Sequence, residues 1–323
     1  MRALVTGVNG FVGSHLADLL RSQAEVELWG AGLFAERPAH LDPSVRTLAV
    51  DLRKAESVHD LIQTVRPDVI YHLAGQAYVP DSRQTPWDTL ETNTRSCINL
   101  MEAALSAGLR PRTLLVSSYE VYDKQAARSG AVDENWPLGP DSPYGVSKVA
   151  QDFLARYYSG QHGIPVIVAR PFNHVGPRQS DRFVAAAFGR QVALISLGQA
   201  PPVVRVGNLA ARRDFTDVRD IVRAYVLLMG HAQPGEVYNL GSGRSRSIRE
   251  LLETLLAIAG VEAEIRVDPE RYRSDTDSDL VCDSSRARAC CGWRPEIPLE
   301  NTLADLLAYE RERLRPGVGS PVV

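Results

Sequence analysis

The chain has 323 residues, of which 44% are apolar and 23% are charged, and its formal net charge is −3. This length allows one α/β unit with a smaller lobe, and the composition is ordinary for a globular protein. The small negative charge gives no reason to expect nucleic acid or an acidic membrane as a partner. No apolar run approaches about 18 residues, so we expect neither a membrane span nor a signal peptide.

The first 22 residues predict a short strand at 3–6, a glycine turn and an amphipathic helix. Gly7, Gly10 and Gly13 have G-x-x-G-x-x-G spacing, which differs from the usual dinucleotide spacing G-x-G-x-x-G. Glycines make such a turn tight and allow backbone N–H groups to approach a pyrophosphate. The position of the turn, between a strand and a helix, favours phosphate binding over an ordinary turn.

Strand and helix patterns alternate through the rest of the first half. Apolar runs occur at 26–29, 47–50, 69–73, 113–117 and 166–169, with amphipathic helix patterns at 57–66, 86–108 and 143–160. This alternation is typical of a parallel, doubly wound sheet. After residue 170 the pattern is irregular: it predicts a helix at 181–197, a strand at 203–206 and a capping box of Ser247 and Glu250 that starts a helix to about residue 258.

Tyr144 and Lys148 are four residues apart in SPYGVSK, a spacing that places them on one face of a helix. Ser142 followed by Pro143 predicts an N-cap and the first helical position, so Tyr144 lies in the first turn. We expect the nearby cation and the helix dipole to lower the pKa of the phenol, as general acid–base catalysis requires. Taken alone, this spacing also describes an ordinary pair on a helix surface.

Several of these motifs follow the ends of predicted strands. The glycine turn follows the first strand, residues 75–76 follow the strand at 69–73, Ser117 and Ser118 end the strand at 113–117, and Asn173 follows the strand at 166–169. The carboxyl ends of parallel strands meet at one edge of a sheet, where ligands bind at the change of winding direction. The alternative for Ser117 and Ser118 is a simple turn at the strand end.

Together with Ser118, these motifs resemble the extended short-chain dehydrogenase/reductase family over nearly the whole chain. The matching segments, in family order, are TGVNGFVG, HLAG, SSYEVY, YGVSK, RPFNHVGP and RRDFTDVRD. The resemblance implies an α/β fold, with a Rossmann-like doubly wound parallel sheet and a smaller C-terminal substrate-binding lobe. It places residues 1–169 and 214–241 in the dinucleotide-binding domain, and residues 170–213 and 242–323 in the lobe.

The resemblance also implies roles for individual residues. Ser118 hydrogen-bonds the reacting oxygen, Tyr144 transfers the proton, and Lys148 assists and binds the nicotinamide ribose. The implied cofactor-binding residues are Gly7, Asn9, Gly10, Phe11, Val12, Gly13, Asp51, Leu52, Leu73, Ala74, Gly75, Tyr144 and Lys148. Asp51 matches an adenine-contacting acid, although a helix cap is an equally simple interpretation.

The choice between NADP and NAD depends on the end of the second strand. An NAD enzyme commonly has an acid there that accepts hydrogen bonds from the ribose hydroxyls. In VELWGAGLFAER, Glu27 lies inside the strand and no acid occupies its immediate end. The sequence therefore favours NADP, with Arg37 a distant candidate for the 2′-phosphate, and NAD remains the alternative.

The substrate implied by the resemblance is a sugar nucleotide. Gln76, Asn173, Arg213 and Arg273 match the family's substrate-binding segments, and the arginine guanidinium suits phosphate oxygens. The alternative for either arginine alone is a solvated surface charge, and for Arg273 the two interpretations weigh equally. The segments at 75–80, 170–180 and 206–220 look most like reductases that convert GDP-4-keto-6-deoxy-D-mannose to GDP-D-rhamnose.

Other activities stay open within the same fold. Glu120 matches the additional acid–base residue of GDP-mannose 4,6-dehydratases, whereas Tyr119 replaces an aspartate of the dTDP-glucose dehydratases. Another sugar-nucleotide epimerase or dehydratase is a further alternative. A non-catalytic dinucleotide sensor on the same fold is disfavoured. Such proteins usually lose the tyrosine or the lysine, whereas this chain has both Tyr144 and Lys148.

Three further expectations concern assembly, metal binding and location. The helices at 86–108 and 143–160 have mixed apolar faces, and relatives pair these helices across a two-fold axis, so we expect a homodimer with a four-helix contact. The alternative is that both faces only cover the sheet; the residues concerned are Ile98, Leu100, Met101, Phe153, Leu154 and Tyr157. No metal site is expected from the seven histidines, which show no H-x-x-x-H pattern. The four cysteines lack C-x-x-C spacing, which favours reduced thiols in the cytoplasm.

Overall fold

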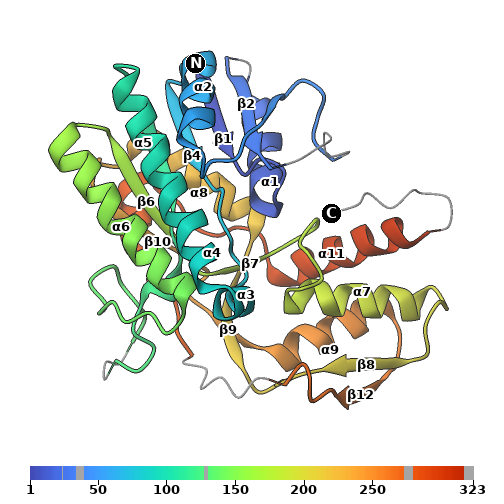
Figure 1. Ribbon diagram of the computed structural model, residues 1–323. Coiled ribbons are helices and arrows are strands. Elements are labelled where there is room, and N and C mark those ends of the chain that lie inside the picture. Colours follow the sequence, from blue (N-terminus) through green and yellow to red (C-terminus); the bar gives the residue numbers. More distant parts are fainter. Residues whose placement is uncertain (24, 34–39, 127–129, 273–278, 316–323) are drawn as a thin grey trace.

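A seven-stranded parallel sheet forms the centre of the described chain, in a computed structural model that describes residues 1–23, 25–33, 40–126, 130–272 and 279–315 (Figure 1). Its strand order is β3-β2-β1-β4-β5-β6-β10, which confirms the doubly wound fold. The chain winds in one direction from β1 and in the other from β4, so the crevice for ligands lies at their carboxyl ends. The strands are β1 (Arg2–Thr6), β2 (Glu27–Gly32), β3 (Arg46–Ala49), β4 (Val69–His72), β5 (Arg112–Val116), β6 (Val166–Pro171) and β10 (Val237–Leu240).

Side chains of each strand alternate between the two faces of this sheet, so both faces carry apolar groups. Helices cover both faces. Ala3 and Val5 of β1 point to the core shared with α1 (Phe11–Arg21) and α8 (Val218–His231). Leu4 points to the opposite core, shared with α2 (Ala55–Val65), α5 (Ser96–Ser106) and α6 (Pro143–His162). Strands buried on both faces explain the continuous apolar runs in the sequence.

The predicted helix at 86–108 is not one regular α-helix. It consists of α4 (Pro86–Leu90), a π-helical turn (Glu91–Arg95) and α5. A π-helical turn accommodates an extra residue within a helix and frequently marks a functional site. Here it buries Asn93, whose side-chain contacts come from distant segments and could not be expected from the helical pattern.

The smaller lobe has its own core, centred on Phe188, Leu252 and Leu306 (Figure 1, lower right). Its helices α7 (Val184–Ser196), α9 (Ile248–Ala259) and α11 (Leu299–Leu314) pack against one another. α7 also contacts β8 (Val203–Val206), which pairs with β12 (Glu264–Val267) in a two-stranded sheet. The capping box of Ser247 and Glu250 is present at the start of α9 as predicted. A three-stranded sheet of β7 (Asn173–Val175), β9 (Arg212–Asp217) and β11 (Ser245–Ser247) completes the described strands.

The packing differs from the expected domain division at α10 (Ser285–Cys291), which we assigned to the lobe. This helix contacts α8 and β10, and Ala287 and Trp293 are fully buried in the core around β1. The Trp293 indole also donates a hydrogen bond to the backbone oxygen of Asp220 at 2.9 Å. The large apolar surface of Trp293 is buried against the main sheet, so this short segment returns to it after α9. The rest of the domain division stays a prediction.

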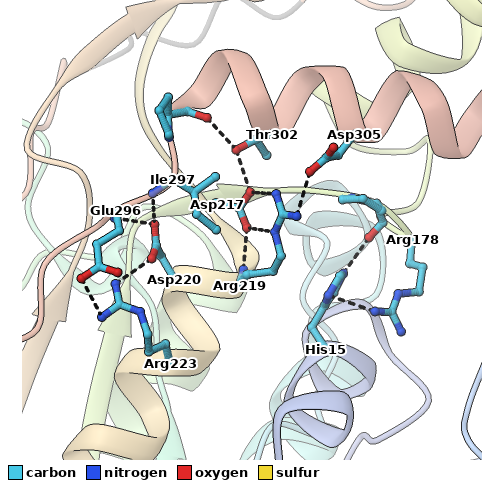
Figure 2. Close-up of polar contacts among 12 residues, drawn as sticks. His15, Arg178, Asp217, Arg219, Asp220, Arg223, Glu296, Ile297, Thr302 and Asp305 are labelled. Carbon is cyan, nitrogen blue, oxygen red and sulfur yellow. Dashed lines mark hydrogen bonds and ion pairs between the residues drawn. The ribbon is translucent and has the colours of Figure 1, made fainter.

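Polar contacts from the start of α8 join the two parts of the chain (Figure 2). Asp217 caps α8 and accepts a hydrogen bond from Thr302 of α11 at 2.7 Å. Arg219 forms ion pairs with Asp217 and with Asp305 of α11, each at 2.7 Å. The segment RRDFTDVRD therefore stabilises the position of the lobe as well as reaching the cavity described below.

None of the helices in the described part of the chain is long and apolar enough to cross a membrane. All four cysteines lie in that part, and each has a free thiol.

Candidate active site

A cavity of about 580 Å³ lies at the carboxyl ends of β4, β5 and β6, between the main sheet and the lobe. Predicted site residues from six segments meet in its wall: Phe11, Val12, Leu73, Ser118, Glu120, Tyr144, Lys148, Asn173 and Arg213. A second hollow of about 560 Å³, between α2 and α5, contains none of them. Convergence of residues so far apart in sequence makes the first cavity the candidate active site.

The glycine turn has no room for a side chain at Gly7 or Gly13. A Cβ atom at Gly13 would lie 2.1 Å from the backbone oxygen of Gly7, and one at Gly7 would lie 2.9 Å from the backbone nitrogen of Ala74. Gly7 also has a φ of +72°, which glycine adopts without strain. The N-terminus of α1 begins at this turn with neither a side-chain cap nor an acid in its first turn. These features fit the pyrophosphate of a dinucleotide cofactor.

Tyr144 and Lys148 project from α6, whose N-terminus forms as predicted. Ser142 is the N-cap, its hydroxyl accepts a hydrogen bond from the Gly145 N–H at 3.1 Å, and Pro143 is the first helical residue. The Lys148 Nζ lies 5.7 Å from the centre of the Tyr144 ring. Both side chains are buried in the wall of the cavity.

The pKa of Tyr144 differs from the expectation. Burial raises this pKa above its ordinary value, a hydrogen bond with Ser118 lowers it, and the charge of Glu120 raises it. Burial also lowers the pKa of Lys148 to about 8, although the charge of Asp152 opposes that change. Removal from water disfavours both the tyrosinate and the lysine ammonium. This effect outweighs the attraction between the two charges that the spacing in the sequence suggested. Tyr144 therefore keeps its proton near neutral pH and is suited to donate it.

Asn93 and Gln151 hold Lys148 in place, and neither residue was predicted from the sequence. The Lys148 ammonium donates hydrogen bonds to the Val116 carbonyl and to Gln151 Oε1, each at 2.9 Å. Gln151 Nε2 in turn donates to the carbonyl of Asn93 in the π-helical turn at 2.8 Å. Gln151 lies three residues after Lys148, so its spacing on the helix was a usable signal. Asn93 offered only a polar residue in a helical pattern.

Glu120 lies in the cavity wall close to the serine. Its Oε2 accepts a hydrogen bond from the Lys124 ammonium at 2.8 Å, and the same ammonium lies 3.2 Å from a carboxylate oxygen of Asp141. All three side chains line the cavity. Glu120 therefore lies in the same wall as Ser118 and Tyr144, and one of its carboxylate oxygens is hydrogen-bonded to Lys124.

Other predicted residues lie outside the cavity wall. Gln76 is held by Asn93, which accepts from its backbone N–H at 2.8 Å, and its side chain donates to the Tyr78 carbonyl at 2.7 Å. Asp51 binds Arg53 at 2.9 Å, and hydrogen bonds from Arg53 lower the pKa of this aspartate. Arg37 and Arg273 lie outside the described residues. Within those residues, no group of three or more histidine, cysteine or acidic side chains is arranged as a metal site.

Comparison with known proteins agrees with this geometry. Residues 4–306 match the family model described as GDP-mannose 4,6 dehydratase. The chain belongs to this family of extended short-chain dehydrogenases/reductases. Membership confirms both the predicted family and the prediction of an oxidoreductase-type enzyme.

Three relatives within this fold are informative. GDP-6-deoxy-D-mannose reductase of Pseudomonas aeruginosa is 37% identical over 97% of this chain and 98% of its own. The structure of RMD from Pseudomonas aeruginosa complexed with NADPH has a TM-score of 0.85 and 36% identity, over 97% of this chain and 99% of that chain. Thermus thermophilus UDP-glucose 4-epimerase, in complex with NAD, has a TM-score of 0.85 and 28% identity, over 96% and 99%.

Proposed function

We propose that the protein uses NADPH to reduce the 4-keto group of GDP-4-keto-6-deoxy-D-mannose, forming GDP-D-rhamnose. The observation that carries this proposal is the 37% identity to GDP-6-deoxy-D-mannose reductase across 97% of the chain. NADPH in the similar Pseudomonas aeruginosa structure supports NADP over NAD, as does the end of β2, where the described residues Gly32 and Leu33 are not acidic. NAD stays the alternative cofactor.

In the proposed reaction a bound nicotinamide supplies the hydride. Tyr144 donates its proton to the ketone oxygen, because its buried phenol keeps that proton near neutral pH. Ser118 donates a hydrogen bond to the same oxygen and helps to orient the ketone. The Lys148 cation, 5.7 Å from the tyrosine ring centre, stabilises the phenolate that remains.

The remaining site residues keep the roles that the family resemblance implies. The glycine turn would hold the cofactor pyrophosphate, and Asn173 and Arg213 in the cavity wall would bind the sugar nucleotide. Gln76 and Arg273 remain proposed substrate residues. The other proposed cofactor-binding residues are Asp51, at the adenine, and Leu52, Leu73, Ala74 and Gly75.

The direct test is incubation of the purified protein with the 4-keto sugar nucleotide and NADPH, followed by identification of the sugar formed. Consumption of NADPH in step with appearance of GDP-D-rhamnose is the expected result. Conversion of GDP-mannose by the wild-type protein without added reductant, at a rate that matches or exceeds reduction, would contradict the proposal.

A second candidate function is GDP-mannose 4,6-dehydration, which the position of Glu120 favours. A dehydratase must remove a C5 proton and expel water, so it needs an acid–base group besides Tyr144. Glu120 is buried in the same wall as Tyr144 and Ser118. Its ion pair with Lys124 gives the carboxylate a structural partner, which supports the reductase interpretation.

Glu120→Gln separates the two functions, because glutamine keeps the shape of the side chain and removes its proton chemistry. We expect the variant to retain most NADPH-dependent reduction, with a loss below about tenfold through binding or packing. Asp141→Asn is the matched control, since Asp141 also binds Lys124 but is not the candidate base. Loss of several orders of magnitude in Glu120→Gln alone, with the fold intact, would favour the dehydratase.

We also propose that the protein is a homodimer. We place it in the cytoplasm, where its four free cysteine thiols would stay reduced. Leu100 and Met101 are buried in the core beneath the sheet, so they do not form the expected contact. On the outer side, Trp87 of α4 is 70% exposed, and Phe153 and Tyr157 of α6 are 55% and 49% exposed. α4 and α6 contact each other, so these large apolar groups lie on adjacent helices and support an interface.

Light scattering tests this assembly. We expect the mass of a dimer at micromolar concentration, and a monomer for Phe153→Glu, because a charge at the interface would be buried without a partner. Tyr272→Glu is the control, since Tyr272 is exposed on the lobe, far from these helices in sequence. A wild-type monomer, or a dimer that Phe153→Glu leaves intact, would count against this interface.

A further inference from the structure

Arg83 is a cation in the cavity wall for which the known motifs give no role. It lies on α3 (Val79–Gln84), four residues after Val79, and both residues line the cavity. Residues four apart share one face of a helix, so Arg83 continues the face that Val79 presents. Its side chain is exposed, and in the part of the chain that the structure describes it has neither a hydrogen bond nor an ion pair.

The acid nearest to Arg83 on its own helix is already paired. Asp81 Oδ1 lies 2.5 Å from the Arg182 guanidinium, which also lies 4.0 Å from the centre of the Tyr78 ring. Phe183 packs edge-on against the same ring, with 5.5 Å between the ring centres. These contacts join α3 to the segment before α7, so Arg83 is positioned where the two parts of the protein meet.

The acids in the cavity wall are also paired with a cation other than Arg83. Glu120 and Asp141 are the carboxylates that line the cavity, and both bind Lys124, at 2.8 and 3.2 Å. Arg213 reaches the same cavity from β9. The described wall thus contains more positive than negative groups, and Arg83 has unused hydrogen-bond donors. This arrangement suits an anionic ligand.

We propose that Arg83 binds the diphosphate of the sugar nucleotide. The inference rests on the proposed function, in which the substrate is a nucleoside diphosphate sugar. A guanidinium can donate two parallel hydrogen bonds to phosphate oxygens, and it keeps its charge throughout the working pH range. The diphosphate is unchanged by reduction at the 4-keto group, so Arg83 contributes equally to the bound substrate and to the transition state. Its loss should therefore raise KM and leave kcat nearly unchanged.

Arg83→Gln tests this assignment. Titration calorimetry should show about a 10- to 100-fold rise in the Kd for GDP, as expected for the loss of hydrogen bonds to a charged group. KM for the 4-keto sugar nucleotide should rise by a similar factor. The Kd for NADPH and the affinity for guanosine should stay near their wild-type values. Arg83→Lys, which retains the charge, should recover part of the affinity.

Arg288→Gln is the matched control, because Arg288 is an exposed arginine on α10 that does not line the cavity. The inference is overturned if Arg83→Gln binds GDP within about twofold of wild type. It is also overturned if kcat falls at constant KM, or if binding of guanosine or NADPH weakens as much as that of GDP. A wild-type protein that binds no GDP would overturn the proposed function, and this assignment with it.

Discussion

Tyr144→Phe is expected to lower kcat for ketone reduction by about 10²-fold or more, the scale of general acid–base catalysis. The change removes one hydroxyl from a side chain whose ring stays buried in the cavity wall. Folding and NADPH binding should therefore remain nearly unchanged, because the ring still fills the same space. The variant separates proton transfer from the other functions of this site.

The measurement is steady-state reduction together with a fluorescence titration of NADPH. Assays below pH 8 give the clearest comparison, because burial lowers the pKa of Lys148 to about 8 and the lysine keeps its proton there. Tyr157→Phe is the matched control, since this exposed tyrosine of the same helix contacts His162 rather than the cavity. Turnover of Tyr144→Phe within a few-fold of wild type would remove Tyr144 from the mechanism.

Gly13→Ala is expected to abolish measurable cofactor binding and to destabilise the fold. The new Cβ atom would lie 2.1 Å from the Gly7 backbone oxygen and 2.8 Å from Val8 Cα. These atoms belong to the backbone of Gly7 and Val8 and cannot move aside as a flexible side chain would, so α1 must separate from the turn. Overpacking of this kind typically costs about 1–3 kcal/mol, and displaced N–H groups no longer converge on the pyrophosphate.

NADPH titration and thermal unfolding measure the two effects separately. Gly160→Ala is the control, because a Cβ atom at this position of α6 meets nothing within 4 Å. Alanine is also the better helix former, so the control should bind NADPH normally and be at least as stable as wild type. Normal NADPH affinity in Gly13→Ala would show that the turn does not hold the cofactor.

The elements predicted correctly from sequence are those specified by local patterns. The N-terminus of α6 is one example, since Ser142 and Pro143 cap the helix through contacts within a single turn. Strands β1 to β6 of the main sheet are another, because burial on both faces demands continuous apolar runs, whereas no strand was predicted at β10. By contrast, β9 contains buried Asp214 and Thr216, so it lacks the apolar pattern of a buried strand. The Asp214 carboxylate is satisfied by distant partners, such as the Ser242 N–H, which donates to it at 2.8 Å.

Some features of the candidate site were likewise indicated by local patterns in the sequence, and others depend on distant segments. Spacing in the sequence made Gly13, Tyr144 and Lys148 candidates, because a tight turn and a shared helix face depend only on neighbouring residues. The protonation of Tyr144 and the places of Asn93 and Arg83 were decided by the tertiary structure. Burial, ion pairing and hydrogen bonding depend on which distant segments surround a group, and those segments meet only when the sheet and the lobe have assembled.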